Sequence, residues 1–468
     1  MHGFLKMSTK ECEIVSEKIV GLIVTEEKRE AAFPFNEHWQ TACLPVGNQA
    51  NIERTVKQLK KEGIIEIYIV ENHLPKQVKK SLKTHKEIRY LKTFEDFLSL
   101  PLNDRYFFYI KGSQYIPKKI FSTLMNKLDS SLDGVLSVSE KTAYKNASNQ
   151  FGIQTKDKHV KALYGFTREH YMNYHTNGVY LINEKCLKHY NTTEDGFQNV
   201  PAGGMPSQKF HIESLIQTTI DEGFSYTYAI SEESVYDLTY PWELLEANIK
   251  HTIEETDSIS ENGSHKNATI HETAVIGENA QFGKNVEIGP HVIIKGKAII
   301  GENTIVSNGA IIEENAIIGS DCLITDYAKI SSGTTIGDNC KIGYTAEVSG
   351  VFFDGVSAVH NSEFFGIAGK SVDIAAACNV GSLRFDDQPT MQKIQGKKYS
   401  GDYSSGVFIG DYTRLGVGNL FYPGVRIGSN SAIGPGAIID LDIEKNTLVN
   451  VHQEKTYSTW GPERYGWS

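Results

Sequence analysis

The chain has 468 residues, of which 40% are hydrophobic and 22% charged, and its formal net charge is −10. This length exceeds what one ordinary hydrophobic core supports, so two or more domains are expected. The acidic balance argues against a nucleic-acid-binding protein, which usually carries a basic stripe.

The six cysteines lack the paired spacing of a disulfide framework or a zinc site. No apolar run reaches the length of about 18 residues that a membrane-spanning helix needs. The N-terminal residues also lack the apolar core of a signal peptide. We therefore expect a cytoplasmic protein with no membrane partner.

After an N-terminal extension, residues 1–17, strand-like and helix-like stretches alternate over residues 18–252. Residues 19–24 are typical of a buried strand, residues 51–61 of an amphipathic helix, and residues 64–70 of the next strand. This βαβ rhythm predicts an α/β domain with a parallel sheet. The following polar stretch, residues 253–269, is predicted to be a linker.

A six-residue repeat follows the linker. From Ile270 to Val348 a large aliphatic residue or Phe recurs at every sixth position, and a small or β-branched residue stands four positions after it. No α-helix has this period, whereas short strands joined by tight turns and wound into a solenoid do. Gly and Asn supply the positive φ that such turns need. Residues 270–440 are therefore predicted to form an all-β parallel β-helix.

The repeat loses its phase after Val348, regains it briefly at Ala368, and regains it fully at Ile409. We expect residues 349–367 and 381–408 to be extruded from the solenoid as loops, where function concentrates. The tail, residues 441–468, is rich in aromatic residues. We expect it to pack on the β-helix or on a neighbouring subunit.

Ordered motifs within the repeat give the chain a resemblance to a known family. They are Phe353-Asp-Gly-Val-Ser-Ala-Val-His360, Ser382-Leu-Arg-Phe-Asp-Asp387 and Tyr422-Pro-Gly-Val-Arg-Ile-Gly428. They resemble the hexapeptide acyltransferases, and more closely the bifunctional sugar-1-phosphate nucleotidyltransferase/acetyltransferases, which are N-acetylglucosamine-1-phosphate uridyltransferase-like. In the N-terminal half, residues 44–48 and 236–248 resemble nucleotidyltransferase segments.

The resemblance implies a nucleotidyltransferase-like (Rossmann-like) N-terminal domain and a left-handed β-helix. It also implies a homotrimer with active sites between subunits, acetyl-CoA or another acyl-CoA as donor, and a small-molecule amine as acceptor. His360 matches the family's general base, since a neutral imidazole suits proton removal near pH 7. The alternative is a solvated loop histidine. The positions expected to bind acyl-CoA are Ala376, Val417, Pro435 and Arg464, and those expected to bind the acceptor are Asp373, Ser382, Arg384 and Ser349.

Several family positions are changed. Thr325 and Ser349 stand where the family has an Arg and a Lys that bind the sugar phosphate, and the family's Gly-Ala-Gly is Ala375-Ala-Ala377. Without those cations the site has lost its strongest phosphate contacts. The acceptor is therefore expected to be an amino group of a sugar, a sugar phosphate or a related small molecule.

The chemistry for nucleotidyl transfer is also changed. The glycine-rich loop after the first strand, which would bind triphosphate through its backbone amides, is replaced by Thr25-Glu-Glu-Lys-Arg-Glu30. The activating Lys is missing from residues 40–43, and Ser113 stands at the first Mg²⁺ ligand, although Asp237 remains at the second. We expect a retained fold that has lost nucleotidyl transfer, and we predict no metal site.

Three functions remain in competition. His360 and the ordered motifs favour an acyl-CoA-dependent N-acyltransferase. Thr325, Ser349 and the triple alanine favour a non-catalytic trimeric binding or regulatory protein. A bifunctional nucleotidyltransferase/acetyltransferase is the third, and the acidic Glu26 and Glu27 argue against it.

Overall fold

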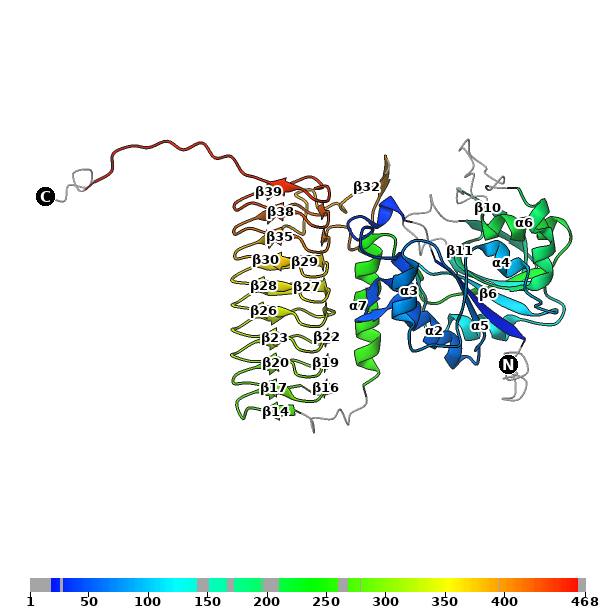
Figure 1. The fold of residues 1–468 in the computed structure, drawn as a ribbon, viewed down its shortest axis with the longest axis horizontal. Coiled ribbons are helices and arrows are strands. Elements are labelled where there is room, and N and C mark those ends of the chain that lie inside the picture. Colours follow the sequence, from blue (N-terminus) through cyan, green and yellow to red (C-terminus); the bar gives the residue numbers. More distant parts are fainter. Residues whose placement is uncertain are drawn as a thin grey trace.

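The computed structural model describes residues 18–25, 28–140, 151–165, 172–194, 196, 210–259, 268–277, 279–394 and 396–461. An α/β domain lies beside a parallel β-helix, and the long helix α7 (Pro241–Asp257) runs between them (Figure 1). Both predicted domain types are confirmed. In the described part of the chain, no helix is both long and apolar enough to cross a membrane.

The N-terminal domain is built on a nine-stranded sheet of order β5-β4-β1-β6-β11-β8-β12-β10-β9. In that order the strands are Arg89–Leu91, Ile67–Val70, Ile19–Val24, Tyr106–Lys111, Tyr174–Asn183, Gly134–Glu140, Tyr226–Ile230, His159–Tyr164 and Gly152–Lys156. β1 pairs in parallel with both β4 and β6, as the βαβ rhythm predicts. The predicted strand at residues 64–70 begins three residues later, at Ile67.

Helices cover both faces of this sheet, and each face has its own core. One core contains residues of α2 (Asn51–Lys61), α3 (Pro75–Ser81) and α5 (Ile120–Lys127). The other contains residues of α4 (Phe94–Leu98) and α6 (Ile212–Asp221). This layering is expected of an α/β domain. The expected parallel sheet is only partly found, because β11 pairs antiparallel with both β6 and β8 and makes the sheet mixed.

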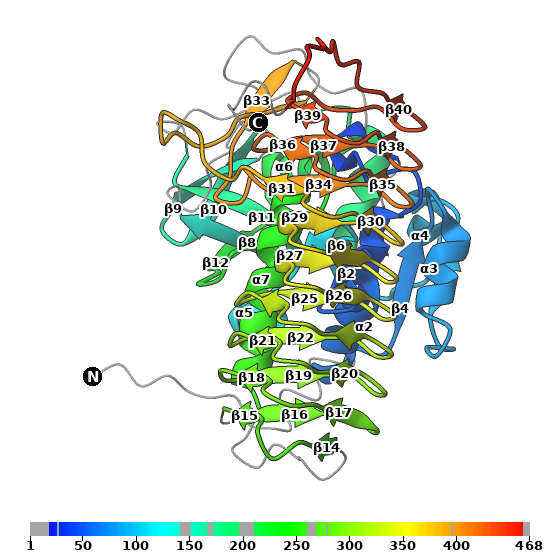
Figure 2. The same cartoon turned by 90° about the vertical axis from the view of Figure 1, so that its left-hand side faces the viewer.

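The β-helix consists of strands mostly of two or three residues, and each pairs with the strand one coil later. Eighteen residues separate partners in the regular coils, as in the pairing of Glu287 with Ile305 and of Ile305 with Leu323. From Phe282 onward the residues at the six-residue period form one continuous buried core, whereas Ile270 in the first coil is 38% exposed. Figure 2 shows the strands stacked in columns from β14 (Ala268–Ile270) to β40 (Leu448–Val449). The coils thus continue beyond Asp440, and an isolated bridge joins Ile427 to Ile443.

The expected extrusion of residues 349–367 is wrong. β27 (Glu347–Phe352) and β29 (Glu363–Ala368) pair along their whole length inside the β-helix. Lys341 pairs with Ser357, sixteen residues on, so this coil is two residues shorter than the regular ones. The two missing residues belong to the turn that divides the corresponding strands of the regular coils. In β27 the chain continues without that turn and bends at Gly350 (φ 118°). A Cβ at Gly350 would lie 2.1 Å from a backbone oxygen of the next coil, so only glycine fits.

The second expected loop is confirmed. The chain leaves the β-helix after β31 (Asn379–Val380) and returns at β34 (Val407–Ile409). Within this excursion, residues 381–406, β32 (Gln392–Ile394) and β33 (Lys397–Tyr399) form an antiparallel hairpin. The start of α7 holds the excursion at its base, because Tyr399 packs on Tyr240 with a ring distance of 5.4 Å and also contacts Trp242.

Helix α7 packs along one face of the β-helix, which includes the coils shortened by two residues. Its Trp242 and Leu245 share a buried cluster with Val351, Ile367 and Phe408 of the β-helix. Further along, the Thr252 and Thr335 hydroxyl oxygens lie 2.7 Å apart. α7 continues to Asp257 and β14 begins at Ala268, so the expected linker, residues 253–269, was placed too wide at both ends.

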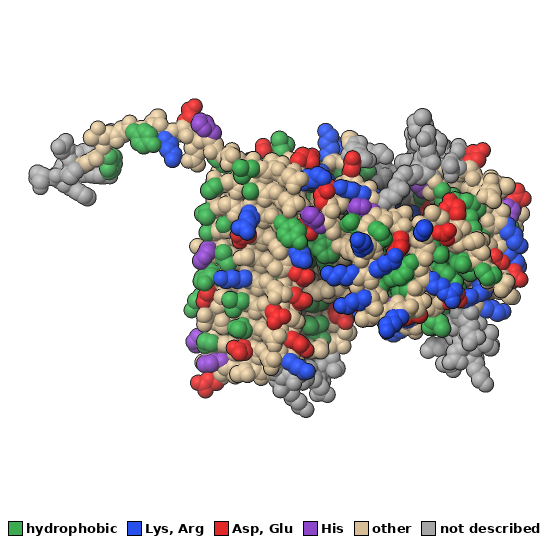
Figure 3. Space-filling view, in the orientation of Figure 1, with side chains coloured by type: hydrophobic (Ala, Val, Ile, Leu, Met, Phe, Trp, Pro, Cys, Tyr) green, Lys and Arg blue, Asp and Glu red, His purple; other side chains and the backbone are tan. Residues whose placement is uncertain are grey.

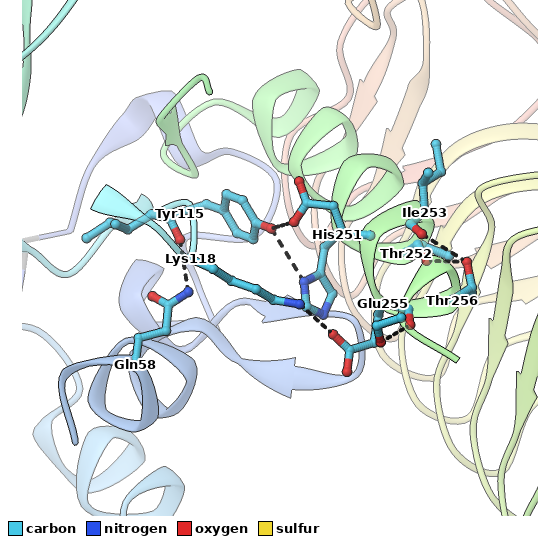
Figure 4. A network of polar contacts seen from close by, with 11 residues as sticks. Gln58, Tyr115, Lys118, His251, Thr252, Ile253, Glu255 and Thr256 are labelled. Atoms are coloured by element: carbon cyan, nitrogen blue, oxygen red, sulfur yellow. Dashed lines mark hydrogen bonds and ion pairs between the residues drawn. The ribbon is translucent and has the colours of Figure 1, made fainter. Parts of the chain in front are cut away.

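A polar network lies where α7 meets the N-terminal domain (Figure 4). The Tyr115 hydroxyl is 3.4 Å from His251 Nδ1, and the Arg54 guanidinium lies 3.8 Å from the centre of the Tyr115 ring. Burial and the Arg54 charge lower the pKa of His251 to about 4. His251 is therefore a neutral, buried side chain at the domain junction near pH 7.

The tail leaves the β-helix as an extended chain, and residues 451–460 are exposed (Figure 1). Tyr457 is 89% and Trp460 67% exposed. The tail therefore does not cover the β-helix of its own chain along these residues. Packing on a neighbouring subunit stays a prediction.

Candidate active site

His360 lies at a corner of the β-helix, in the turn between β28 (Ser357–Val359) and β29. The turns at this corner stack on one another through backbone hydrogen bonds. Ala377 N donates to His360 O at 2.8 Å, Gly418 N to Ala376 O at 2.9 Å, and Gly436 N to Val417 O at 2.9 Å. His360, Ala376, Val417 and Pro435 therefore occupy one column, which we call the His360 corner. The sequence predicted these four residues for one site, and the fold brings them together.

The His360 corner is on the side of the β-helix away from α7. The residues that contact α7 are Val351, Ile367 and Phe408, which lie in the second halves of β27 and β29 and in β34, on another face of the coils from the β28–β29 turn. Figure 3 shows histidine and hydrophobic side chains along the edge of the β-helix farthest from the N-terminal domain. The described part of the N-terminal domain therefore does not cover His360, which is exposed. A substrate could approach this corner from solvent or from between neighbouring copies.

His360 is exposed and sits in a tight turn with φ 56°, followed by Asn361 at φ 59°. Its backbone N–H donates to Gly343 O at 3.2 Å, which fixes the turn on the coil below. The imidazole stacks on the Tyr344 ring, with centroids 4.3 Å apart and planes 18° apart. Stacking occupies a ring face, so the two nitrogens at the ring edge stay available for proton transfer.

The corner beyond His360 is lined by small residues. Ala376, Val417 and Pro435 are each followed by a residue that can take positive φ, namely Ala377, Gly418 and Gly436. Val417 is 54% exposed, and a Cβ added to Gly418 would meet nothing within 4 Å. Arg464, the fourth predicted position, lies outside the described residues.

The four predicted acceptor positions are not gathered at His360. Asp373 is on β30 (Asp373–Ile374) between Ser357 and Arg414. Ser349 is in the middle of β27, beside Phe365. Ser382 and Arg384 are exposed in the excursion. In the described structure, no hydrogen bond or ion pair links the side chains of these four residues to His360.

Arg384 already has a partner. Its guanidinium binds both carboxylate oxygens of Asp386 at 2.8 and 2.7 Å. This contact lowers the pKa of Asp386 to about 2. The Nε edge of Arg384 is therefore occupied, and a phosphate could bind only through the remaining N–H groups on Nη1 and Nη2.

In the N-terminal domain, the positions that correspond to the family's nucleotide site make contacts within the protein. At the end of β1 the Thr25 hydroxyl donates to Val70 O at 2.9 Å and accepts from Asn72 N at 3.0 Å. Ser113 is buried, and Asp237 Oδ1 accepts from Thr239 N at 3.0 Å. Among the described residues, no group of three or more His, Cys, Asp or Glu side chains could hold a metal ion.

The chain after β1 instead contacts the β-helix. We call residues 28–40 the docking segment. Its Trp39 Nε1 donates to Asp411 Oδ2 at 2.8 Å, and its Pro34 carbonyl accepts from Ser429 Oγ at 3.2 Å. Phe35 packs on Phe353 with a ring distance of 5.5 Å. Sequence reasoning missed this interface, although the apolar run Phe33-Pro-Phe35 before Trp39 was its available signal.

Comparisons with known proteins agree with the resemblance in the β-helix. The family model described as the GMPPB C-terminal domain matches residues 259–365. The bifunctional protein GlmU of Methanococcus maripaludis is 46% identical over 82 residues, which are 16% of this chain and 20% of that protein. A bifunctional sugar-1-phosphate nucleotidylyltransferase/acetyltransferase of Sulfurisphaera tokodaii is 33% identical over 106 residues, 22% of this chain and 26% of that protein.

These matches span only about a fifth to a quarter of the length of the curated relatives. Among solved structures, the inositol-1-phosphate CTP transferase of T. maritima aligns with 52% of this chain and 98% of its own, at 11% identity and a TM-score of 0.40. The fold of the N-terminal domain therefore rests on its own strand order, given above.

Proposed function

We propose that this protein is an N-acyltransferase that uses acetyl-CoA or another acyl-CoA. The acceptor is the amino group of a sugar, a sugar phosphate or a related small molecule. The observation that carries the proposal is the His360 corner, where an exposed imidazole stands in one column with Ala376, Val417 and Pro435. The names of the relatives, which include acetyltransferases, support the same class of reaction.

In this reaction the amine nitrogen attacks the thioester carbonyl of the acyl-CoA. The neutral imidazole of His360 accepts a proton from the nitrogen as the C–N bond forms. The C–S bond then breaks, and the CoA thiolate leaves with a proton returned from the imidazolium. The exposed ring edge of His360 suits both transfers, and the small residues along the corner leave room for the CoA arm.

We also propose that the active form is a homotrimer in which a neighbour completes each site. Within one chain the predicted acceptor residues are apart from His360. The excursion also exposes two large apolar side chains, since Leu383 is 80% and Phe385 109% exposed. Side chains of this kind are seldom left in water when a partner can cover them.

The N-terminal domain is proposed to have lost nucleotidyl transfer and to serve as a structural partner of the β-helix. The docking segment supports this, because the chain that follows the position of the triphosphate loop packs on coils of the β-helix. The relatives named as bifunctional support the competing proposal, in which both activities are present.

The test of the acyltransferase is His360→Asn, because Asn tolerates the positive φ of this turn. Acyl transfer to amino sugars, with and without phosphate, should fall about 10²–10⁴-fold, while the melting temperature stays unchanged. His291→Asn is the matched control, since His291 is an exposed histidine of φ 58° at the same corner in an earlier coil. Full activity of His360→Asn would exclude His360 as the base.

A non-catalytic binding protein is the second candidate. It is favoured by the ion pair of Arg384 with Asp386, because the guanidinium that was expected to bind the acceptor already binds a carboxylate. A wild-type protein that binds CoA esters, as a rise in melting temperature would show, but acylates none of the amines would support this candidate.

A further inference from the structure

The Tyr344 and His360 rings stack on each other between two neighbouring coils. The two turns are joined by the backbone hydrogen bond from Asn361 N to Tyr344 O at 3.0 Å. Tyr344 has φ 56° and His360 has φ 56°, so both side chains leave the corner from turns of the same shape. The rings are then nearly parallel, with centroids 4.3 Å apart.

The contact is not explained by the need to bury apolar surface. Tyr344 is 40% exposed, and His360 is exposed as well. A β-helix corner of this kind needs only residues that accept positive φ, and in an earlier turn at this corner Asn308 and Gly309 do so. The Tyr344 ring therefore adds something that the turn itself does not require.

A tyrosine face is electron-rich and attracts a cation placed over it. The Tyr344 ring presents such a face to His360, with the two ring planes 18° apart. When His360 accepts a proton its imidazolium would lie over the same ring. Stacking would stabilise that cation and hold the imidazole plane, while leaving the ring nitrogens at the exposed edge.

We propose that Tyr344 is a positioning residue for His360, which fixes the plane of the imidazole and stabilises its protonated form during acyl transfer. This inference rests on the proposed function, in which His360 is the general base. Tyr344 acts through His360 and has no contact with the reacting atoms. Its loss should therefore change kcat and leave KM for the amine acceptor unchanged.

The experiment compares Tyr344→Asn and Tyr344→Phe with the wild-type full-length protein. Asn keeps the positive φ of the turn and removes the ring, whereas Phe keeps the ring and removes the hydroxyl. Aromatic stacking is typically worth about a 2- to 10-fold effect, so we expect kcat of Tyr344→Asn to fall by that factor. Tyr344→Phe should retain wild-type kcat.

Tyr327→Asn is the matched control, because Tyr327 is an exposed tyrosine of φ 60° on the same corner that lies over Gly309 and makes no stack with His360. It should leave kcat unchanged. Wild-type kcat in Tyr344→Asn would overturn the inference. A change confined to KM would also overturn it, because Tyr344 would then contact the acceptor. Full activity of His360→Asn would instead remove the proposed function, and the inference with it.

Discussion

Trp39 donates its indole N–H to Asp411 across the domain boundary, with Nε1 and Oδ2 2.8 Å apart. Asp411 is 2% exposed, and its other carboxylate oxygen accepts from Lys370 N at 2.9 Å. Burial raises the pKa of Asp411, and the hydrogen bonds from Lys370 N and Trp39 Nε1 offset part of that rise. The pair fastens the docking segment of the N-terminal domain to the last third of the β-helix.

Removing this pair should loosen the two domains. Asp411→Ala leaves the Trp39 and Lys370 N–H groups without their acceptor, so we expect a loss of about 1–3 kcal/mol in the free energy of unfolding. Trp39→Phe should cost less than that, and the double variant should show a coupling energy of about 1 kcal/mol in a denaturation cycle. The ion pair between the half-buried Glu37 and the exposed Lys445, 2.8 Å apart, is the control and should contribute little. If the losses of unfolding free energy in Trp39→Phe and Asp411→Ala simply add in the double variant, the hydrogen bond between the two residues does not stabilise the domain contact.

Nucleotidyl transfer should be absent. With Mg²⁺, a nucleoside triphosphate and a sugar-1-phosphate, the purified protein is expected to release no pyrophosphate, because residues 25–30 lack the glycines of the triphosphate loop and the activating Lys is missing. Ser113→Asp, which restores only the first carboxylate, should also remain inactive. Turnover of the wild type on the order of 1 s⁻¹ would instead support the bifunctional proposal.

The β-helix was predictable because each coil repeats one pattern, and from Phe282 onward the residues at the six-residue period are its buried core. The mistake at residues 349–367 came from treating lost phase as an extruded loop. A deletion of two residues at one turn breaks the phase equally well and keeps the chain in the solenoid, with Gly350 and Gly366 at the bend. Only the pairing of neighbouring coils separates these two cases.

The site was predictable where it depends on the repeat. Ala376, Val417 and Pro435 align with His360 because the corner recurs in every coil. The acceptor side was not predictable, since Ser382 and Arg384 lie in an excursion whose shape the repeat does not determine. The Tyr344–His360 stack was also missed, because it depends on side-chain directions at two turns sixteen residues apart.

The protein should be a trimer in solution. Light scattering is expected to give three times the chain mass of 52.1 kDa. If a neighbour covers the excursion, Phe385→Asp should weaken assembly, because it would place a charge in an apolar contact. Tyr457→Asp, in the exposed tail, tests whether the tail contributes as well. A wild-type monomer at micromolar concentration would remove the site between subunits from the proposal.

Stability should fall in mild acid because of His251. The folded pKa is about 4, whereas an unfolded histidine has a pKa of about 6.5. The unfolded chain therefore binds more protons between these values, so the stabilising contribution is complete above pH 6.5 and is lost as the pH falls through 4. The full contribution is about 3 kcal/mol at most.

The groups that face His251 decide how this should be tested. They are the Tyr115 hydroxyl, the Arg54 guanidinium, and the pair formed by Lys118 and Glu255 at 3.1 Å (Figure 4). In urea denaturation at several pH values, His251→Gln should flatten the dependence of stability on pH between 6.5 and 4, because glutamine does not titrate. Tyr115→Phe keeps the burial and the Arg54 charge, so it should retain the slope. An unchanged slope in His251→Gln would assign the acid sensitivity to another group and would leave His251 without a role in it.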